Sequence, residues 1–238
     1  MQAFIKKGKK GTVLMSLGTN MKSNMLGEER LRSILQVFAQ LSDYNFVWKY
    51  ESEIKDLPMK PSKNVMIGKF LPQNDILAHP NLIAFISHSG MLSTHEALWH
   101  GKPIIGIPIF VDQHRNLEKL MKIGVGVYID FRTLKADNFK AKLLEVLEEP
   151  SFFQNARKIS KRFQDKPQSP LDKAIWWVEY AIRNPDLENL KSPTLKLGFI
   201  ASNSYDILIF LIIFLHLIVF GSLKLIQKIT KTTKSKKE

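Results

Sequence analysis

The chain has no cysteine among its 238 residues. Disulfide bonds and cysteine-ligated zinc are therefore excluded, and cysteine usage says nothing about the redox compartment. Acidic residues are also scarce, because 22 aspartates and glutamates stand against 35 lysines and arginines, for a formal charge of +13. This excess of basic residues raises nucleic acid as one class of partner.

The distribution of the positive charge argues against nucleic acid. Lysines gather in KKGKK at residues 6–10 and again in residues 224–238, and no stretch between them interleaves basic and aromatic residues. Charge at the ends of a chain is typical of solvated tails or of the flank of a membrane span. We therefore expect no nucleic-acid partner.

One long run lacks polar residues almost entirely. Residues 205–223, YDILIFLIIFLHLIVFGSL, are apolar apart from Asp206 at the edge and His216. The length matches what a helix needs to cross a hydrocarbon core. A buried core helix is the alternative, but the basic run that follows and the missing polar face favour a transmembrane helix.

The flanks of this run predict its orientation. Basic residues crowd positions 224–238, whereas 197–206 contain none, so the tail is expected in the cytosol and the globular part across the membrane.

The start, MQAFIKKGKKG, has no apolar signal segment. Either the chain is tail-anchored against its charge bias or it lacks its natural N-terminus, and we favour the second interpretation. Lys234 and Lys236 match a dilysine retrieval spacing, which predicts the endoplasmic reticulum.

Short apolar runs alternate with segments of helical periodicity through the first part of the chain. Strands are predicted at 12–18, 45–50, 64–68, 82–87, 102–109 and 125–130, and helices at 27–41, 72–79, 91–101, 112–124 and 135–183, the last broken at 165–170. Strands that are apolar on both faces predict a Rossmann-like parallel α/β sheet covered by helices, with its ligand at the carboxyl ends of the strands. The predicted organisation is a domain over 1–184, a linker over 185–204, a transmembrane helix over 205–223 and a basic tail over 224–238.

The stretch SHSGMLSTHEALWHGKP, residues 87–103, concentrates the polar chemistry. A zinc helix needs ligands four residues apart, but His95 and His100 are five apart and would diverge by about 140° on a helix. A hydrolase elbow needs glycine on both sides of the serine, and the glycine before Ser89 is missing. We expect neither a metal site nor a hydrolase.

Anion binding fits this stretch better. A strand, the turn HSG and a helix follow one another, so Ser93 and Thr94 fall in the first helical turn, where free amides and the helix dipole attract phosphate. The hydroxyls of Ser89, Ser93 and Thr94 can also donate, and Glu96 can accept from sugar hydroxyls. The alternative, that Ser93 and Thr94 only cap the helix, stays open.

A longer motif carries a family resemblance. Residues 70–116 read FLPQNDILAHPNLIAFISHSGMLSTHEALWHGKPIIGIPIFVDQHRN, with a P-Q pair, a strand, H-x-G, a glutamate eight residues after the histidine, G-x-P and D-Q. This pattern resembles the signature of UDP-glycosyltransferases, the family that includes the UDP-glucuronosyltransferases. The resemblance extends from VLMSLGT through WWVEYAIR to the apolar run and basic tail. It implies the C-terminal, donor-binding domain of a GT-B glycosyltransferase followed by one transmembrane helix.

The resemblance implies contacts to the nucleoside and the sugar. Phe70 stands where the family usually has tryptophan and would stack on the uracil over a smaller area. Gln73 would contact the nucleoside, and Glu96 would bind the ribose hydroxyls. Asp112 and Gln113 would bind the hydroxyls of the transferred sugar.

The resemblance also implies a diphosphate site. His88 and the amides of Ser93 and Thr94 would hold the diphosphate. The family usually reads H-G-G or H-C-G, and here Ser89 precedes Gly90; serine would cost on the order of 1 kcal/mol if its position needs a positive φ. The diphosphate and the interdomain cleft would be lined by Ser16, Gly18 and Thr19.

The implied reaction is displacement at the anomeric carbon with inversion and departure of UDP, whose charge His88 and the amides would stabilise. The UDP-sugar is a co-substrate, and no cofactor is expected. The family's general base lies in the acceptor domain, so no catalytic residue is expected in this chain.

We expect the donor-binding half of a membrane enzyme that transfers glucose or glucuronate to a small lipophilic acceptor. The alternative is a non-catalytic UDP-sugar-binding or regulatory protein that pairs with a full-length transferase; a dimer or pairing with an acceptor domain stays open.

Overall fold

The computed structural model describes residues 1–19 and 21–235, which leaves Lys236 of the predicted retrieval signal outside the described residues. The chain forms two compact units, Met1–Pro167 and Gln168–Glu238. The division falls before the helix that the sequence prediction had placed at the end of the first domain. The boundary at residue 184 stays a prediction.

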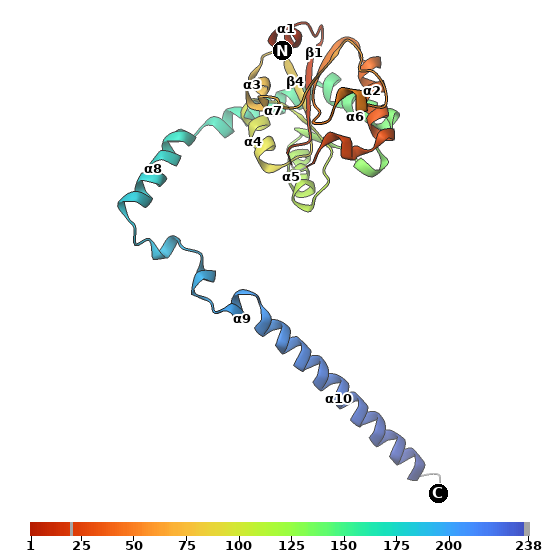
Figure 1. The fold of residues 1–238 in the computed structure, drawn as a ribbon, viewed down its shortest axis with the longest axis vertical. Coiled ribbons are helices and arrows are strands. Elements are labelled where there is room, and N and C mark those ends of the chain that lie inside the picture. Colours follow the sequence, from red (N-terminus) through yellow and green to blue (C-terminus); the bar gives the residue numbers. More distant parts are fainter. Residues whose placement is uncertain (20, 236–238) are drawn as a thin grey trace. The chain divides into compact units, whose positions relative to one another are not determined.

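Unit 1 is built on one parallel sheet of six strands (Figure 1). The order is β3-β2-β1-β4-β5-β6, and every neighbouring pair is parallel. The strands are β1 Gly11–Ser16, β2 Tyr44–Lys49, β3 Val65–Gly68, β4 Leu82–Ser87, β5 Ile104–Gly106 and β6 Gly126–Tyr128. The predicted Rossmann-like sheet is thus confirmed, although β5 and β6 are shorter than expected.

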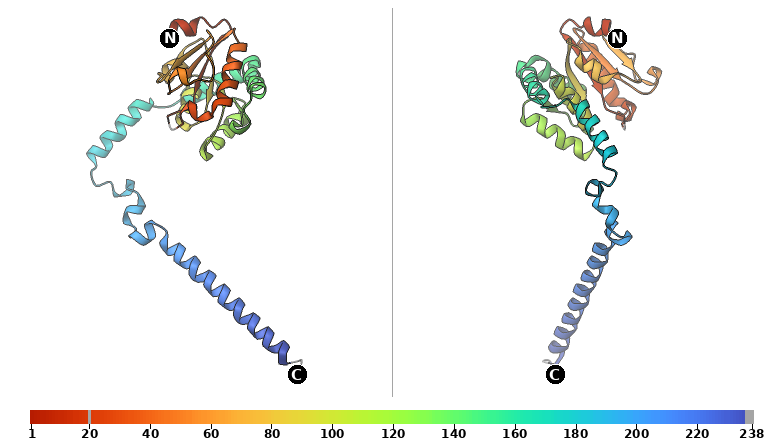
Figure 2. Two further views of the ribbon diagram at one scale, coloured as in Figure 1. Left: turned by 45° about the vertical axis from the view of Figure 1, so that its right-hand side comes forward. Right: turned by 90° about the vertical axis from the view of Figure 1, so that its left-hand side faces the viewer.

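Helices cover both faces of this sheet (Figure 2). Unit 1 contains α1 Gln2–Lys6, α2 Glu28–Gln40, α3 Gln73–Ala78, α4 Met91–Trp99, α5 Val111–Lys122, α6 Ala136–Glu148 and α7 Pro150–Gln164. The sequence prediction missed α1. Its Ile5 is nevertheless buried, and the Ile5 carbonyl accepts a hydrogen bond from Thr12 Oγ1 at 2.9 Å.

Two apolar cores form because successive strand residues point to opposite faces. In β1, Val13 and Met15 belong to the core under α2 and α6, whereas Leu14 belongs to the core under α3, α4, α5 and α7. All three side chains are fully buried. This double burial explains why the strands read as continuous apolar runs.

The sheet has a topological switch point between β1 and β4. These strands are neighbours, with Ser16 opposite Ser87 at their carboxyl ends. The chain leaves β1 toward α2 on one face and leaves β4 toward α4 on the other. Diverging connections of this kind leave a crevice at the carboxyl edge, where parallel α/β sheets bind ligands.

Unit 2 begins with α8 Pro170–Arg183 and ends with α9 Phe199–Ser202 and α10 Tyr205–Ser235. Between α8 and α9 the predicted irregular linker contains two short 3₁₀ helices, Glu188–Leu190 and Pro193–Lys196. Within the described residues, one helix is long and apolar enough to cross a membrane by length and composition, over Tyr205–Ile226.

Candidate functional site

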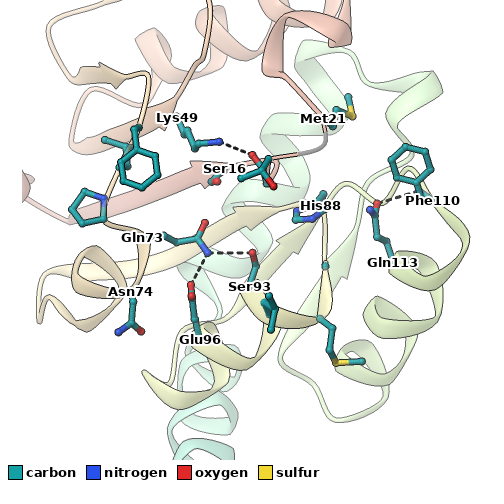
Figure 3. Close-up of a pocket in the computed structure, with 18 of the residues that line it drawn as sticks. Ser16, Met21, Lys49, Gln73, Asn74, His88, Ser93, Glu96, Phe110 and Gln113 are labelled. Carbon is teal, nitrogen blue, oxygen red and sulfur yellow. Dashed lines mark hydrogen bonds between the residues drawn. The ribbon is translucent and has the colours of Figure 1, made fainter. Parts of the chain in front are cut away.

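A pocket of about 900 Å³ opens at the switch point. Its wall includes the last residue of β1, Ser16, the last residue of β2, Lys49, and His88, which follows β4 directly. Figure 3 shows these side chains converging from the strand ends, opposite residues from α3, α4 and α5. The pocket therefore lies where the parallel topology predicts a ligand site.

Eleven of the thirteen predicted site residues line this one pocket. They are Ser16, Gly18, Thr19, Phe70, Gln73, His88, Gly90, Ser93, Glu96, Asp112 and Gln113. The other two, Ser89 and Thr94, are 0% and 5% exposed and lie behind the lining. The fold thus gathers residues that are up to 97 positions apart in the sequence.

The start of α3 is tied to α4 by one glutamine. Gln73 Nε2 donates to Ser93 Oγ at 3.1 Å and to Glu96 Oε2 at 2.6 Å (Figure 3). Ser93 and Glu96 lie three residues apart on α4 and so share one helix face. The Glu96 carboxylate is thereby oriented at the pocket wall with one oxygen still able to accept from a ligand.

His88 is held between two glycines. A Cβ on Gly18, whose φ is +86°, would lie 2.7 Å from His88 Cε1, and a Cβ on Gly90 would overlap Nε2. Burial lowers the pKa of His88 below its ordinary 6.5; the Asp112 carboxylate opposes this effect and Lys49 strengthens it. The ring is therefore neutral at pH 7 and offers one donor and one acceptor nitrogen.

The first turn of α4 presents backbone amides. Its N-cap is Gly90, and no side chain caps the helix, so the interpretation of Ser93 and Thr94 as caps is wrong. The expectation for the Thr94 amide also needs correction, because Thr94 N donates to Gly90 O at 2.9 Å. The amides that precede this first helical bond belong to Met91, Leu92 and Ser93.

Ser89 adopts a left-handed conformation with φ of 62°. In this conformation serine costs on the order of 1 kcal/mol relative to glycine. Its Oγ has no hydrogen-bond partner among the described residues, and the same holds for His88 Nδ1 and Thr94 Oγ1. Asn116 Nδ2 donates to Ser89 O at 3.1 Å and holds the strained turn.

The start of α5 forms the opposite wall. Gln113 Oε1 accepts from Ile109 N at 2.8 Å and from Phe110 N at 3.1 Å. Its oxygen is therefore committed to the backbone, and its amide nitrogen is the group that it can offer to a ligand. Asp112 is exposed at the pocket rim.

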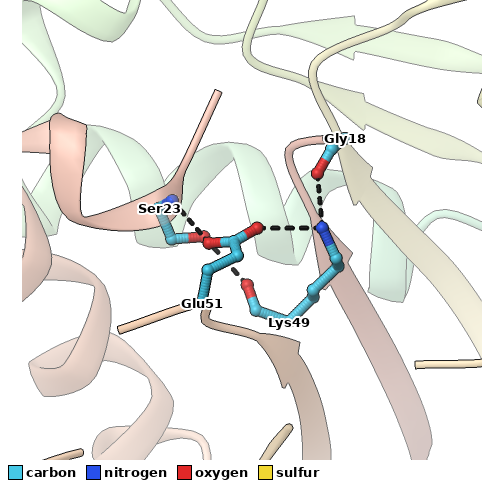
Figure 4. A network of polar contacts seen from close by, with 4 residues as sticks. All are labelled: Gly18, Ser23, Lys49 and Glu51. Atoms are coloured by element: carbon cyan, nitrogen blue, oxygen red, sulfur yellow. Dashed lines mark hydrogen bonds and ion pairs between the residues drawn. The ribbon is translucent and has the colours of Figure 1, made fainter. Parts of the chain in front are cut away.

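A buried lysine enters the pocket from β2. Lys49 Nζ donates to Gly18 O at 2.6 Å and pairs with Glu51 Oε1 at 2.9 Å (Figure 4). The other Glu51 oxygen accepts from Ser23 N at 2.8 Å, and Ser23 Oγ donates to Lys49 O at 2.8 Å. This network fixes the loop after β1 against β2. Sequence reasoning missed both Lys49 and Asn116.

The histidines considered for zinc have other partners. The His95 ring packs against Phe163 of α7 with centroids 5.4 Å apart. His100 Nε2 hydrogen bonds to Asn74 Oδ1 at 2.8 Å. The two side chains therefore face different neighbours, as their five-residue spacing predicts.

Comparison with known proteins settles the family. The family model described as UDP-glucoronosyl and UDP-glucosyl transferase matches residues 1–238. The chain belongs to this family. A UDP-glycosyltransferase UGT5 from Dactylopius coccus is 35% identical over 94% of this chain and 43% of the relative. UDP-glucuronosyltransferase 2B17 from Homo sapiens is 34% identical over 100% of this chain and 44% of the relative.

This UDP-glycosyltransferase family member therefore spans less than half the length of the curated relatives it matches. Solved structures agree on the fold. Spinosyn forosaminyltransferase SpnP has a TM-score of 0.63 and 22% identity over 76% of this chain and 46% of its own. UGT71G1 from Medicago truncatula, solved with UDP-glucose, has a TM-score of 0.59 and 21% identity over 70% of this chain and 38% of its own. At this identity the likeness establishes the fold alone, which corresponds to less than half of a GT-B glycosyltransferase.

Proposed function

We propose that this chain is the donor-binding half of a membrane UDP-glycosyltransferase. The observation that carries the proposal is the pocket at the switch point, which combines a neutral histidine, a helix start with free amides and an oriented carboxylate. Family membership supports a UDP-sugar as the ligand.

In this proposal the diphosphate lies against His88 and the amides of Met91, Leu92 and Ser93. The dipole of α4 adds partial positive charge at the same place. Lys49 places its ammonium group, paired with Glu51 Oε1 at 2.9 Å, at the pocket wall. As UDP departs, negative charge grows on the diphosphate, and these fixed groups stabilise it without reorganising.

The nucleoside is assigned to the side of the pocket formed by α3 and α4. Phe70 is 83% exposed, so its ring is free to stack on uracil. Glu96 would bind the ribose hydroxyls while Gln73 holds it in place. On the α5 side, Asp112 and the Gln113 amide nitrogen would bind the transferred sugar, either glucose or glucuronate.

The transfer itself needs an acceptor and a general base. We propose that an acceptor domain supplies both, because the pocket's histidine is assigned to the diphosphate in this proposal and its ring is held by glycines on two sides. The acceptor would be a small lipophilic alcohol or phenol, and the displacement would invert the anomeric centre. No cofactor takes part in this scheme.

The apolar helix is proposed as a single-pass anchor over Tyr205–Ile226. The basic residues that follow it favour a cytosolic tail and a lumenal globular unit, and the lysine-rich end favours the endoplasmic reticulum. Protease treatment of sealed microsomes tests the orientation: a C-terminal epitope should be digested while unit 1 stays protected.

Calorimetric titration of the full chain in detergent tests the donor site. UDP should bind, and 2′-deoxy-UDP should bind roughly ten- to hundredfold more weakly because a charged hydrogen bond contributes about 1.5–3 kcal/mol. Glu96→Gln should weaken UDP and remove the preference for the 2′-hydroxyl. Glu118→Gln, on the exposed surface of α5, is the matched control. If Glu96→Gln retained the preference, the ribose assignment would be wrong, and if UDP did not bind at all, the donor-site proposal would be wrong.

A further inference from the structure

The segment before α10 exposes a run of apolar side chains. Leu195, Leu197, Phe199 and Ile200 are 73%, 48%, 74% and 56% exposed. Single exposed apolar residues are ordinary on a protein surface, but four within six positions form a patch that needs an explanation. We call residues 195–204 the elbow.

The elbow is in contact with the first residue of the candidate span. The rings of Phe199 and Tyr205 pack with centroids 5.7 Å apart. A bilayer has about 30 Å of hydrocarbon within a total thickness of about 40–45 Å, so each interfacial layer is about 5–8 Å deep. With Tyr205 at the hydrocarbon edge, the Phe199 ring is no more than 5.7 Å from that edge in depth, in the region where aromatic rings are favoured.

Several backbone groups of the elbow are paired within it or with the residues just before it. The carbonyl of Phe199 accepts from Asn203 Nδ2 at 2.8 Å and from Ser202 Oγ at 3.1 Å. Ser204 N donates to Ala201 O at 3.1 Å, and the φ of Ser204 is 58°, which turns the chain between α9 and α10. Internal pairing of this kind lowers the cost of leaving water.

We propose that the elbow lies in the membrane interface on the N-terminal side of the span. Leu195, Leu197, Phe199 and Ile200 are inserted among the lipid headgroups, and the turn at Ser204 redirects the chain into the hydrocarbon. The elbow would then fix the depth of α10 in the bilayer. This inference rests on the proposed function of α10 as a membrane anchor.

The absence of cysteine allows a direct test with single-cysteine variants. The full chain would carry a fluorophore at Phe199→Cys or Leu197→Cys and be reconstituted into phosphatidylcholine vesicles. Leu215→Cys, near the middle of Tyr205–Ile226, reports the hydrocarbon centre. Asp137→Cys, on the exposed surface of α6, reports the aqueous phase. Quenching is measured with nitroxide lipids labelled near the headgroup or near the chain end, and with aqueous iodide.

At positions 197 and 199 we expect stronger quenching by the shallow nitroxide than by the deep one, and little quenching by iodide. Position 215 should show the reverse preference, and position 137 should respond to iodide alone. If position 215 responded to the deep nitroxide while 197 and 199 responded only to iodide, the elbow would be in water and the inference overturned. Shielding of 197 and 199 from both quenchers would place them against protein and overturn it too. If position 215 met no nitroxide, the anchor proposal would fail first.

Discussion

Replacing Lys49 by methionine tests how the donor pocket is held together. The substitution keeps most of the side-chain volume and removes the ammonium group. Glu51 Oε1 then loses its ion-pair partner, Lys49 Nζ, which lies 2.9 Å away. The Gly18 carbonyl oxygen loses the same group as its donor, at 2.6 Å. We expect Lys49→Met to lower both the stability of unit 1 and the affinity of the pocket for UDP.

The size of the stability loss follows from the burial of the pair. The side chains of Lys49 and Glu51 are 10% and 17% exposed, and removing one partner of a buried pair costs about 3–5 kcal/mol. Glu51 keeps the hydrogen bond from Ser23 N at 2.8 Å, so we expect the lower end, about 3 kcal/mol. For a domain of this size that is a fall in Tm of roughly 6–12 °C. The unanchored Gly18 loop and the lost charge should weaken UDP binding about tenfold.

The assay uses the full chain in detergent, with thermal unfolding for stability and calorimetric titration for UDP. Lys102→Met is the matched control. Lys102 is also a buried lysine, 6% exposed, and its Nζ donates to Leu82 O at 2.7 Å, but it does not line the pocket. Lys102→Met should therefore leave UDP affinity unchanged.

Two results would refute the reasoning about Lys49. Equal UDP affinity in Lys49→Met and Lys102→Met would mean that Lys49 only supports the fold. A double variant, Lys49→Met with Glu51→Met, should recover stability relative to Lys49→Met because no buried charge is left unpaired. If the double variant were less stable still, the unpaired carboxylate would not be the cause of the loss.

Three further predictions concern the same pocket. Ser89→Gly should raise Tm by roughly 2–4 °C. The substitution removes the left-handed strain and the buried hydroxyl that has no hydrogen-bond partner, and this gain in stability exceeds the entropy cost of glycine by about 1 kcal/mol. An unchanged or lower Tm would contradict this. The lowered pKa of His88 means that the unfolded chain takes up a proton first, so stability is lost as the pH falls below about 6.5; His88→Gln should flatten part of that decline between pH 5 and 7 in pH-dependent melting, and His79 and His100, whose pKa values are also lowered, contribute to the decline that remains. Phe70→Ala should leave Tm nearly unchanged, because the ring is 83% exposed, yet weaken UDP binding about tenfold by titration through lost stacking, whereas Phe70→Trp should bind UDP at least as well as the parent chain.

The sequence predicted the parallel sheet because its strands are buried on both faces and appear as unbroken apolar runs. The ends of the strands could not be predicted in the same way. Apolar residues continue beyond β5, and Ile107 is 0% exposed although it lies outside the strand. Burial and strand pairing therefore end at different residues, and apolarity reports burial alone.

The helix α1 escaped prediction for a related reason. Five residues are too few for local periodicity to be informative. The helix is held by distant side chains, since Asn81 Nδ2 donates to Ile5 O at 2.6 Å and Asn45 Nδ2 donates to Phe4 O at 2.7 Å. Only the assembled sheet brings these amides to the N-terminus.

The candidate site shows the same division between local and non-local information. Residues 70–116 contain a continuous motif, and eight of the eleven predicted residues that line the pocket come from it. Lys49 lies outside that motif and looks like a surface lysine at the end of a strand. It meets Gly18 because β1 and β2 are neighbours in the sheet. The order of the strands could have pointed to it, whereas local residue patterns could not.

The strain at Ser89 is explained by what its neighbours must do. His88 has to face the pocket between Gly18 and Gly90, while the next residues must start α4 with their amides toward the same space. A left-handed residue between them turns the chain sharply enough to satisfy both demands, and Asn116 fixes its carbonyl at 3.1 Å. Relaxing the φ of Ser89 would rotate either the ring or the helix start away from the pocket. The strain therefore belongs to the geometry of the site, which is why glycine at position 89 should add stability while leaving the affinity for UDP unchanged.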